Sequence, residues 1–243
     1  YDMELYAHEA KMCGATILPP CINLSDHINV IHGRNIYLGL GNLRDLERPV
    51  IQRLLTERQL HGRFRDFDDF IDRVPISIEQ LSILVRIDAF RCFGVPKKEV
   101  LWQAVFKTRA YGKRTHQNLL FKPRHRNFKL PQLPSHPVED AYDQLELLGF
   151  PLCGYYALMD GEPKSRLVYR DFPDHLNRKI LVYGAMVHTR TNTTSKGEVM
   201  RFTTMLDLSG EFFDCVHFPQ AMDQTPIHGK GIYACYGMVT EEF

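Results

Sequence analysis

Hydrophobic side chains recur at helical spacing through much of the first half of the chain. Three stretches show this spacing: residues 45–58, 64–74 and 96–106. Apolar positions three and four residues apart share one face of a helix, so each stretch predicts an amphipathic helix. Ser77 followed by Gln80 predicts a capping box at the start of one more helix. We therefore expect residues 36–106 to form an all-helical unit of four short helices, preceded by the end of another helix at residues 4–13.

The pattern changes to strand spacing from Lys179 onward. Four runs are rich in β-branched and aromatic residues: 179–187, 200–207, 212–218 and 232–239. A polar turn at 189–197 and a Ser209-Gly210 hairpin separate the first three. Three strands in a meander, a connector and a further strand follow the order of an OB-fold barrel, which has five strands. The predicted fold class is therefore multidomain α+β: an all-helical unit, a basic linker and a truncated OB-fold barrel whose fifth strand lies beyond Phe243.

Length and charge narrow this picture only slightly. The chain has 243 residues, which corresponds to one or two domains. Thirty Lys and Arg face 29 Asp and Glu, so the formal net charge of +1 identifies no partner. No run approaches the length of about 18 apolar residues that a membrane-spanning helix needs. The first residues lack a signal-peptide pattern, and the six cysteines form no C-x-x-C pair, so we expect a cytoplasmic protein with reduced, buried thiols.

A basic stretch without acidic residues lies between Glu99 and Glu139. Prolines interrupt it, which predicts an irregular linker over residues 107–138. Charge runs of this kind are most often solvated and flexible. The alternative is contact with a polyanion, with interleaved aromatic residues available to stack on bases. The candidate DNA contacts are Lys113, Arg114, Arg124 and Arg126.

Gly39 and Gly41 form a second candidate motif just before a predicted helix. Arg44 stands where a dinucleotide-binding fingerprint would need its third glycine. The motif can instead be the hairpin of a helix-hairpin-helix unit, in which backbone N–H groups and a helix N-terminus hold a DNA phosphate. The competing interpretation is a turn in which glycine serves only packing. The motif alone favours packing.

The predicted barrel carries a third candidate surface. OB-folds bind single-stranded nucleic acid on strands 2 and 3, flanked by the loops between strands 1–2 and 4–5. The candidate contacts in this region are Arg190, Lys196, Arg201, Phe202 and Phe218. Because side chains alternate between the two faces of a strand, only some of them can face outward.

Catalytic and metal-binding patterns are not recognisable in the sequence. There is no Ser-His-Asp order and no phosphate-binding loop, and the eleven histidines are scattered. Asp68 and Asp72 share a helix face, but the apolar residues beside them indicate an ordinary amphipathic helix. We expect no catalytic residue, metal or cofactor in this segment.

Several motifs follow one another in an order that is more specific than any of them alone. They are Glu9-Ala10-x-x-x-Gly14, Ile17-Leu18-Pro19-Pro20, Tyr37-x-Gly39-x-Gly41-x-x-Arg44, Phe67-x-Asp69-Phe70, Glu146-x-Leu148-Gly149-Phe150, and a run from Lys179 through Gly184, Asp207-x-Ser209-Gly210 and Phe218-Pro219. In this order they resemble the bacterial C-family DNA polymerases, the family of the DNA polymerase III alpha subunit and its error-prone paralogue. The resemblance covers nearly the whole chain.

The resemblance implies five regions. These are the end of the polymerase fingers (1–34), a tandem helix-hairpin-helix domain (35–106), the basic linker (107–138), a helical connector (139–175) and a truncated OB-fold (176–243). Two departures weaken the expectation that the hairpins grip DNA. Asp45 and Glu47 stand where the family's first hairpin has glycines, and Asp88 stands at a common glycine of the second.

The resemblance also implies a function for the parent chain. A polymerase would hold Mg²⁺ on aspartates of a palm domain expected before Tyr1, and would transfer nucleotides by a two-metal mechanism. This segment would hold duplex DNA with its helical unit and single-stranded template with its barrel, alongside other replisome or repair subunits. A protein-interaction scaffold is the non-enzymatic alternative. A DNA ligase fits less well, because its modules occur in the reverse order and no K-x-D-G site is present.

Overall fold

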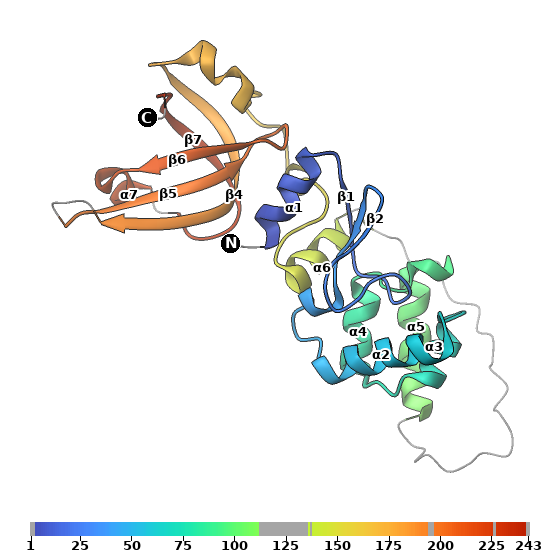
Figure 1. Cartoon of the computed structure of the whole chain (residues 1–243). Coiled ribbons are helices and arrows are strands. Elements are labelled where there is room, and N and C mark those ends of the chain that lie inside the picture. Colours follow the sequence, from blue (N-terminus) through green and yellow to red (C-terminus); the bar gives the residue numbers. More distant parts are fainter. Residues whose placement is uncertain (1–2, 112–135, 137, 194–196, 226, 242–243) are drawn as a thin grey trace, which may run out of the picture. The chain divides into compact units, whose positions relative to one another are not determined.

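The chain folds as two units, which are described separately below. The computed structural model describes residues 3–111, 136, 138–193, 197–225 and 227–241. One unit spans Thr16–Leu152, and the other combines Tyr1–Ala15 with Cys153–Phe243 (Figure 1). We refer to them as the helical unit and the sheet unit.

The helical unit packs its helices around a core of aromatic and aliphatic side chains. Its α-helices are α2 (Arg48–His61), α3 (Phe67–Arg73), α4 (Ile78–Arg86), α5 (Lys97–Tyr111) and α6 (Glu139–Leu148), with short 3₁₀ turns at Leu40–Asn42 and Arg91–Phe93. Leu54, Phe70, Leu84 and Phe90 are almost completely buried. Phe90 meets Phe70 edge to face at 5.0 Å between ring centroids, an arrangement that aromatic pairs favour. The predicted helical unit is thus confirmed.

A small sheet that periodicity did not predict as a unit precedes these helices. Its strands are β1 (Thr16–Leu18), β2 (Val30–His32) and β3 (Asn35–Tyr37), in the order β1-β3-β2. Residues 35–40 form a short strand-like run in the sequence, and of the three strands only β3 lies in it, ending at Tyr37 rather than residue 40. Pairing with strands distant in sequence, rather than local pattern, creates this sheet.

Several predicted helix boundaries need correction. The helix expected from residue 45 begins at Arg48, because Asp45 has a left-handed backbone with φ 62°. The helix expected from residue 64 begins at Phe67, where the Asp66 side chain caps it by accepting from the Asp69 N–H. The helix expected to end at residue 106 continues to Tyr111, and no glycine or proline interrupts the sequence before Gly112.

Only half of the predicted capping box forms. Ser77 caps α4 by accepting a hydrogen bond from the Gln80 N–H. The Gln80 side chain does not return the bond to Ser77. It binds the backbone of Asp45 and Glu47 instead, so a residue predicted to act locally joins two distant parts of the chain.

The sheet unit is built on one antiparallel sheet. Its strands β4 (Lys179–Thr193), β5 (Val199–Leu206), β6 (Phe212–His217) and β7 (Ile232–Met238) lie in the order β6-β5-β4-β7. The sheet curls around an apolar core that includes Ile180, Met205 and Phe213 (Figure 1). This half-barrel and its strand order confirm the predicted OB-like region. Helices α1 (Met3–Met12) and α7 (Pro219–Gln224) and 3₁₀ turns at Tyr155–Leu158 and Tyr169–His175 complete the unit.

The first long strand extends further than predicted. The polar turn expected from Thr189 is part of β4, which continues to Thr193 and pairs with β5 from Val199 to Thr203. Threonine suits a pleated strand, and the ladder supplies hydrogen bonds that the isolated sequence pattern did not reveal. This correction moves Arg190 from a loop onto the sheet.

Helix α1 belongs to the sheet unit through a buried polar cluster. The Glu4 carboxylate is fully buried and is bonded by the Tyr155 hydroxyl and the Lys230 ammonium. His8, one turn further on, lies with its ring 6.2 Å from that of Phe212. Because a buried carboxylate is costly unless its charge is paired, these contacts hold α1 in place.

Candidate nucleic-acid interface

The glycine motif of the helical unit does not offer free amides. The Leu40 N–H donates to the Asp26 carbonyl at 2.8 Å, and the Gly41 N–H donates to the His27 carbonyl at 2.9 Å. The Gly39 N–H donates to Asn29 Oδ1 at 2.8 Å. All three N–H groups are therefore used within the protein.

Close packing explains why both positions are glycine. A Cβ at Gly39 would lie 2.4 Å from the His27 carbonyl oxygen, and a Cβ at Gly41 would lie 2.8 Å from the same atom. Neither distance is possible for a real side chain. Of the two interpretations of the motif, this geometry supports the packing one, since the glycines admit the loop of residues 26–29.

Arg44 lies beside the C-terminal end of helix α6, not beside backbone N–H groups that are free to bind a phosphate. Its N–H donates to the Leu147 carbonyl at 2.9 Å, near the C-terminus of α6. A Cβ on Gly149 would lie 2.5 Å from Arg44 Nη2, so the guanidinium occupies the space beside this glycine. Gly149 caps α6 with a φ of 92°. Arg44 is exposed, so it can still meet an anion at the surface.

Asp45 and Asp88 both adopt the left-handed backbone that glycine prefers. Their φ angles are 62° and 59°. They stand at the first and second hairpins, where the resembling family has glycine. Asp tolerates this backbone better than most residues, so both positions can adopt it without the glycine that the resemblance predicts. Asp45 projects a carboxylate into solvent, and burial raises the pKa of Asp88.

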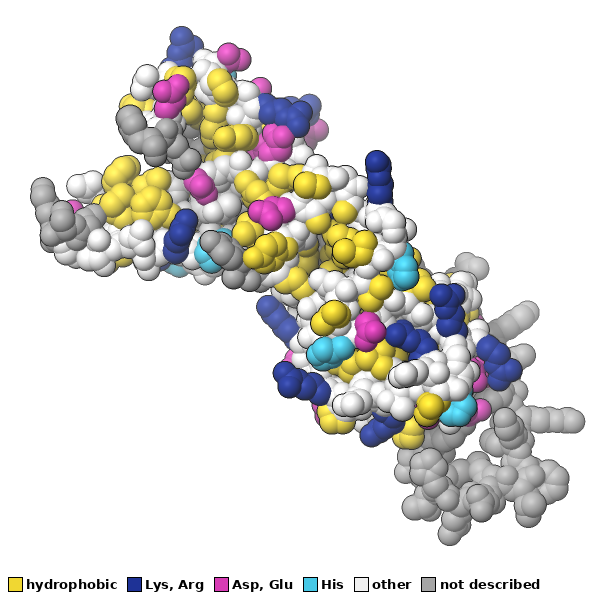
Figure 2. All heavy atoms as spheres, in the orientation of Figure 1, with side chains coloured by type: hydrophobic (Ala, Val, Ile, Leu, Met, Phe, Trp, Pro, Cys, Tyr) yellow, Lys and Arg dark blue, Asp and Glu magenta, His cyan; other side chains and the backbone are white. Residues whose placement is uncertain are grey.

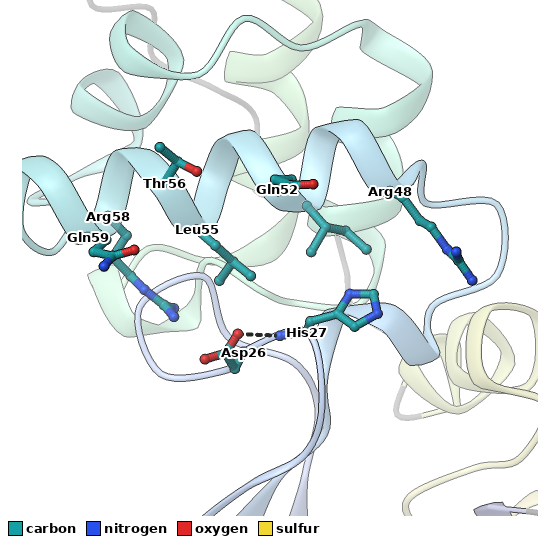
Figure 3. Close-up of a pocket in the computed structure, with 9 residues that line it drawn as sticks. Asp26, His27, Arg48, Gln52, Leu55, Thr56, Arg58 and Gln59 are labelled. Atoms are coloured by element: carbon teal, nitrogen blue, oxygen red, sulfur yellow. Dashed lines mark hydrogen bonds between the residues drawn. The ribbon is translucent and has the colours of Figure 1, made fainter.

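A groove that the sequence did not indicate runs along α2. It has a volume of about 870 Å³ and lies between this helix and the loop that carries Asp26 and His27 (Figure 3). Arg48, Gln52, Thr56 and Gln59 contribute exposed polar side chains from the helix. The spacing of these four residues could have revealed a polar helix face, but nothing local placed His27 opposite it.

The outer face of the sheet unit brings two candidate residues, Arg190 and Phe202, side by side. Arg190, Phe202 and Val216 are direct cross-strand partners on β4, β5 and β6, so their side chains share one face. Phe213 points into the core, which places this row on the opposite, outer face. Phe218 follows β6 and is 56% exposed. The row therefore combines a cation with apolar and aromatic surface.

Helix α1 covers only one end of this outer face. Phe212 lies on the same face as Val216 and contacts His8 of α1. Between the covered end and the row, Thr204 donates a hydrogen bond to Asp214. At the other end, Phe202 is half-buried and Arg190 beside it is exposed.

Arg201 lies on the inner face, away from Phe202. It is the cross-strand partner of His217, and both side chains are half-buried. Arg201 Nη1 donates to the Ile227 carbonyl at 3.1 Å. Burial, aided by the nearby Arg201 charge, lowers the pKa of His217. The structure therefore separates Arg201 from the other candidates on these strands.

The remaining candidates lie outside the described residues. They are Lys113, Arg114, Arg124 and Arg126 of the basic linker and Lys196 of the turn after β4.

Charged groups on the helical unit are mostly engaged by the protein itself. Arg86 binds Asp143 and Glu146, and Lys97 binds Asp140 and Asp143, which ties α6 to its neighbours. Figure 2 shows Lys, Arg and His side chains spread over the face of this unit that carries α2 and α3. No described group of three or more His, Cys, Asp or Glu side chains could hold a metal ion.

The expectation of buried thiols is wrong for half of the cysteines. Cys21 is buried, but Cys13, Cys92 and Cys153 are exposed. Each exposed thiol lies at the end of a helix or in a turn, where a small side chain reaches solvent. In the described part of the chain, no helix is both long and apolar enough to cross a membrane.

Comparison with known proteins gives these surfaces a context. A helix-hairpin-helix motif family matches residues 14–100. The DNA polymerase III subunit alpha of Staphylococcus epidermidis is 29% identical over 239 residues, which covers 94% of this chain and 22% of the relative. The error-prone DNA polymerase of Mycobacterium tuberculosis is 32% identical over 106 residues, or 43% of this chain and 10% of the relative.

A further relative is the DNA polymerase III subunit alpha of Staphylococcus aureus, 34% identical over 96 residues, or 38% of this chain and 9% of the relative. The chain thus spans about a fifth of the length of the S. epidermidis protein, and about a tenth of the length of the other two relatives. These matches bear out the resemblance drawn from the motifs: the chain is similar over nearly its whole length to a bacterial DNA polymerase III alpha subunit, and over shorter stretches to an error-prone DNA polymerase.

Proposed function

We propose that this chain is a DNA-binding segment of a bacterial C-family DNA polymerase, replicative or error-prone, that acts in the cytoplasm. The helical unit holds duplex DNA, and the sheet unit holds the single-stranded template. Nucleotidyl transfer and its Mg²⁺ belong to a palm domain of the parent protein. Other polymerase or repair subunits are its protein partners.

The row of Arg190, Phe202 and Val216 is the observation that carries the single-strand part of this proposal. Single-strand-binding surfaces combine cations, which follow the phosphates, with aromatic faces, on which bases stack. The row provides both on the outer side of the β4-β5-β6 face, where Arg190 and Val216 are exposed and Phe202 is half-buried, and Phe218 adds an exposed ring. Strands of an OB-like sheet are the usual place for such a surface.

The engaged amides at Gly39, Leu40 and Gly41 favour a second candidate function. If the hairpins do not hold phosphates, the chain can serve as a protein-interaction scaffold in a replication or repair assembly. The exposed apolar side chains of the sheet unit, such as Tyr236 at 71% exposure, suit a protein partner as well as DNA. The two functions differ in how binding responds to salt.

Fluorescence anisotropy with labelled single-stranded and duplex oligonucleotides, at several salt concentrations, tests the proposal. Binding that weakens linearly in log K against log[salt] supports contact with DNA phosphates. Replacing Arg190 and Lys196 by Ala should make the single-strand slope shallower by about 0.7 for each lost contact. Phe202→Ala should weaken single-strand binding by about 1–3 kcal/mol for each base that no longer stacks.

Lys179→Gln is the matched control, because Lys179 is an exposed cation at the other end of β4. It should leave single-strand binding unchanged. If Arg190 and Phe202 variants bind as the unmodified chain does, the outer row is not the template surface. If the chain binds neither oligonucleotide at low salt, the scaffold function is favoured.

A further inference from the structure

The groove along α2 is a feature of the helical unit that the hairpins do not explain. Leu55 and Arg58 descend from α2 toward the loop of Asp26 and His27, and in this view the His27 imidazole lies between Leu55 and Arg48 (Figure 3). The groove is open to solvent along the helix, since Arg48, Gln52 and Gln59 are exposed.

The groove offers hydrogen-bond donors and positive charge with little opposing charge. Arg48, Gln52, Thr56 and Gln59 recur along α2 and line the groove, and the His27 ring lies below the half of the helix that carries Arg48 (Figure 3). The one carboxylate in the lining is Asp26, which accepts from the His27 N–H at 2.7 Å. The Arg58 guanidinium is close enough to the Asp26 carboxylate for the two opposite charges to attract each other. Arg58 also donates hydrogen bonds to the Ile22 and Ser25 carbonyls.

The glycine motif builds this groove indirectly. The Leu40 and Gly41 N–H groups hold the carbonyls of Asp26 and His27, which fixes the loop against the 3₁₀ turn. The His27 ring stands directly over Gly41, where a Cβ would lie 2.9 Å from Cε1. Glycine at position 41 therefore lets the imidazole take its place at the wall of the groove.

We propose that this groove binds the phosphates of one strand of duplex DNA. The inference rests on the proposed function and names a site for its duplex-binding half. Arg48 and Gln59 are separated by about 16 Å along the helix axis. Phosphates of one strand rise about 3.4 Å each along the duplex axis, so several of them fit this length.

The lining residues favour a duplex over a single strand. Side chains that hydrogen-bond to phosphates position a duplex without reading its sequence. Single-strand sites add aromatic rings for stacking, and the groove is lined by none of Phe, Tyr or Trp. The groove and the outer row of the sheet unit thus suit different forms of DNA.

Two substitutions on the exposed side of α2 test the site in the full chain. Arg48→Gln should make the slope of log K against log[salt] shallower by about 0.9 for a fluorescein-labelled duplex. Thr56→Glu places a carboxylate in the groove on a residue type that favours helix, and should weaken duplex binding about tenfold. Circular dichroism of each variant confirms that the fold is retained.

Matched controls carry the same charge changes outside the groove. Arg34→Gln alters an exposed arginine of the β2–β3 turn, and Leu60→Glu adds a carboxylate to the exposed side of α2. Both should leave duplex binding within twofold of the unmodified chain.

The outcomes separate this inference from the proposed function. Weaker duplex binding in the groove variants, with unchanged binding in the control variants, supports the site. Duplex binding that is unchanged in both groove variants overturns the site and leaves the DNA-binding function standing. Equal loss in groove and control variants also overturns it, because the effect is then one of net charge. A chain that binds single strands but no duplex overturns the site and the duplex half of the function together.

Discussion

The side-chain carbonyl of Gln80, on α4, accepts a hydrogen bond from the backbone N–H of Glu47 at 2.8 Å. The amide nitrogen of the same side chain donates to the Asp45 carbonyl, also at 2.8 Å. One buried side chain therefore satisfies both ends of the first hairpin and joins it to α4. This places the hairpin in the core of the helical unit, although its charged residues face solvent.

Replacing Gln80 by Ala should destabilise the helical unit. The substitution removes both hydrogen bonds to the part-buried backbone of the hairpin, and each such bond contributes about 0.5–1.5 kcal/mol. Urea unfolding followed by circular dichroism measures the loss. Gln59→Ala, on the exposed side of α2, is the control and should change the free energy of unfolding little. Equal stability of the two variants would contradict the role given to Gln80.

Replacing Asp88 by Asn should stabilise the protein at neutral pH. Burial raises the pKa of Asp88 in the folded state, despite the opposing charge of Arg91. Between the unfolded and folded pKa values the folded state binds more protons, so the free energy of unfolding falls as pH rises through this range. Asn keeps the left-handed backbone and does not titrate. The gain should therefore shrink as pH falls through the raised pKa of folded Asp88, and be absent below the ordinary Asp pKa of about 3.9.

Unfolding curves over a pH series measure this dependence. Asp45→Asn is the control, because Asp45 shares the left-handed backbone but is exposed. A gain that came from the backbone alone would appear equally in both variants, and would refute the effect of burial.

Changing Asp45 and Glu47 to Gly should strengthen duplex binding. The change removes two exposed carboxylates from the first hairpin. Since the Glu47 N–H is already held by Gln80, the gain should come from lost repulsion rather than from a new amide contact. The pair Asp45→Asn and Glu47→Gln removes the same charges and keeps the side chains, so it should show a similar gain in anisotropy titrations. No gain in either variant would show that these carboxylates do not oppose DNA.

Replacing Gly184 by Ala should destabilise the sheet unit by about 1–3 kcal/mol, the usual cost of overpacking. A Cβ on Gly184 would lie 2.7 Å from Phe213 Cζ and 2.8 Å from Met205 Cβ. Gly237→Ala, on the neighbouring strand β7, is the matched control because its Cβ would meet nothing within 4 Å. Thermal unfolding compares the two. A Gly237 variant as unstable as the Gly184 variant would point to backbone effects instead of the core.

Local pattern was enough to predict the main elements of both units. The helix that begins after Ser77 and the strands from Lys179 onward follow the periods of 3.6 and 2 that a buried face imposes. The order of the strands also identified the OB-like arrangement before the sheet was known. These features depend on residues close together in sequence.

Boundaries and faces depended on contacts that local pattern does not contain. β4 continues to Thr193 because β5 supplies the opposite half of its ladder. Arg201 and Phe202 are adjacent in sequence, yet one joins the inner face beside His217 and the other the outer row beside Arg190. Alternation predicts that they separate, but only the position of the core decides which of them lies on the inner face.

The candidate sites show the same division. The sequence by itself indicated a glycine-containing turn at positions 39 and 41, and showed that the chain carries family motifs in order. Only the tertiary structure decided what those glycines serve, because the loop of Asp26 and His27 that fills the space beside them is separated from them by the β2–β3 hairpin. A backbone N–H group can donate its hydrogen bond to a ligand or to a neighbouring loop. Long-range packing decides which partner it finds, and the spacing of the residues along the chain does not.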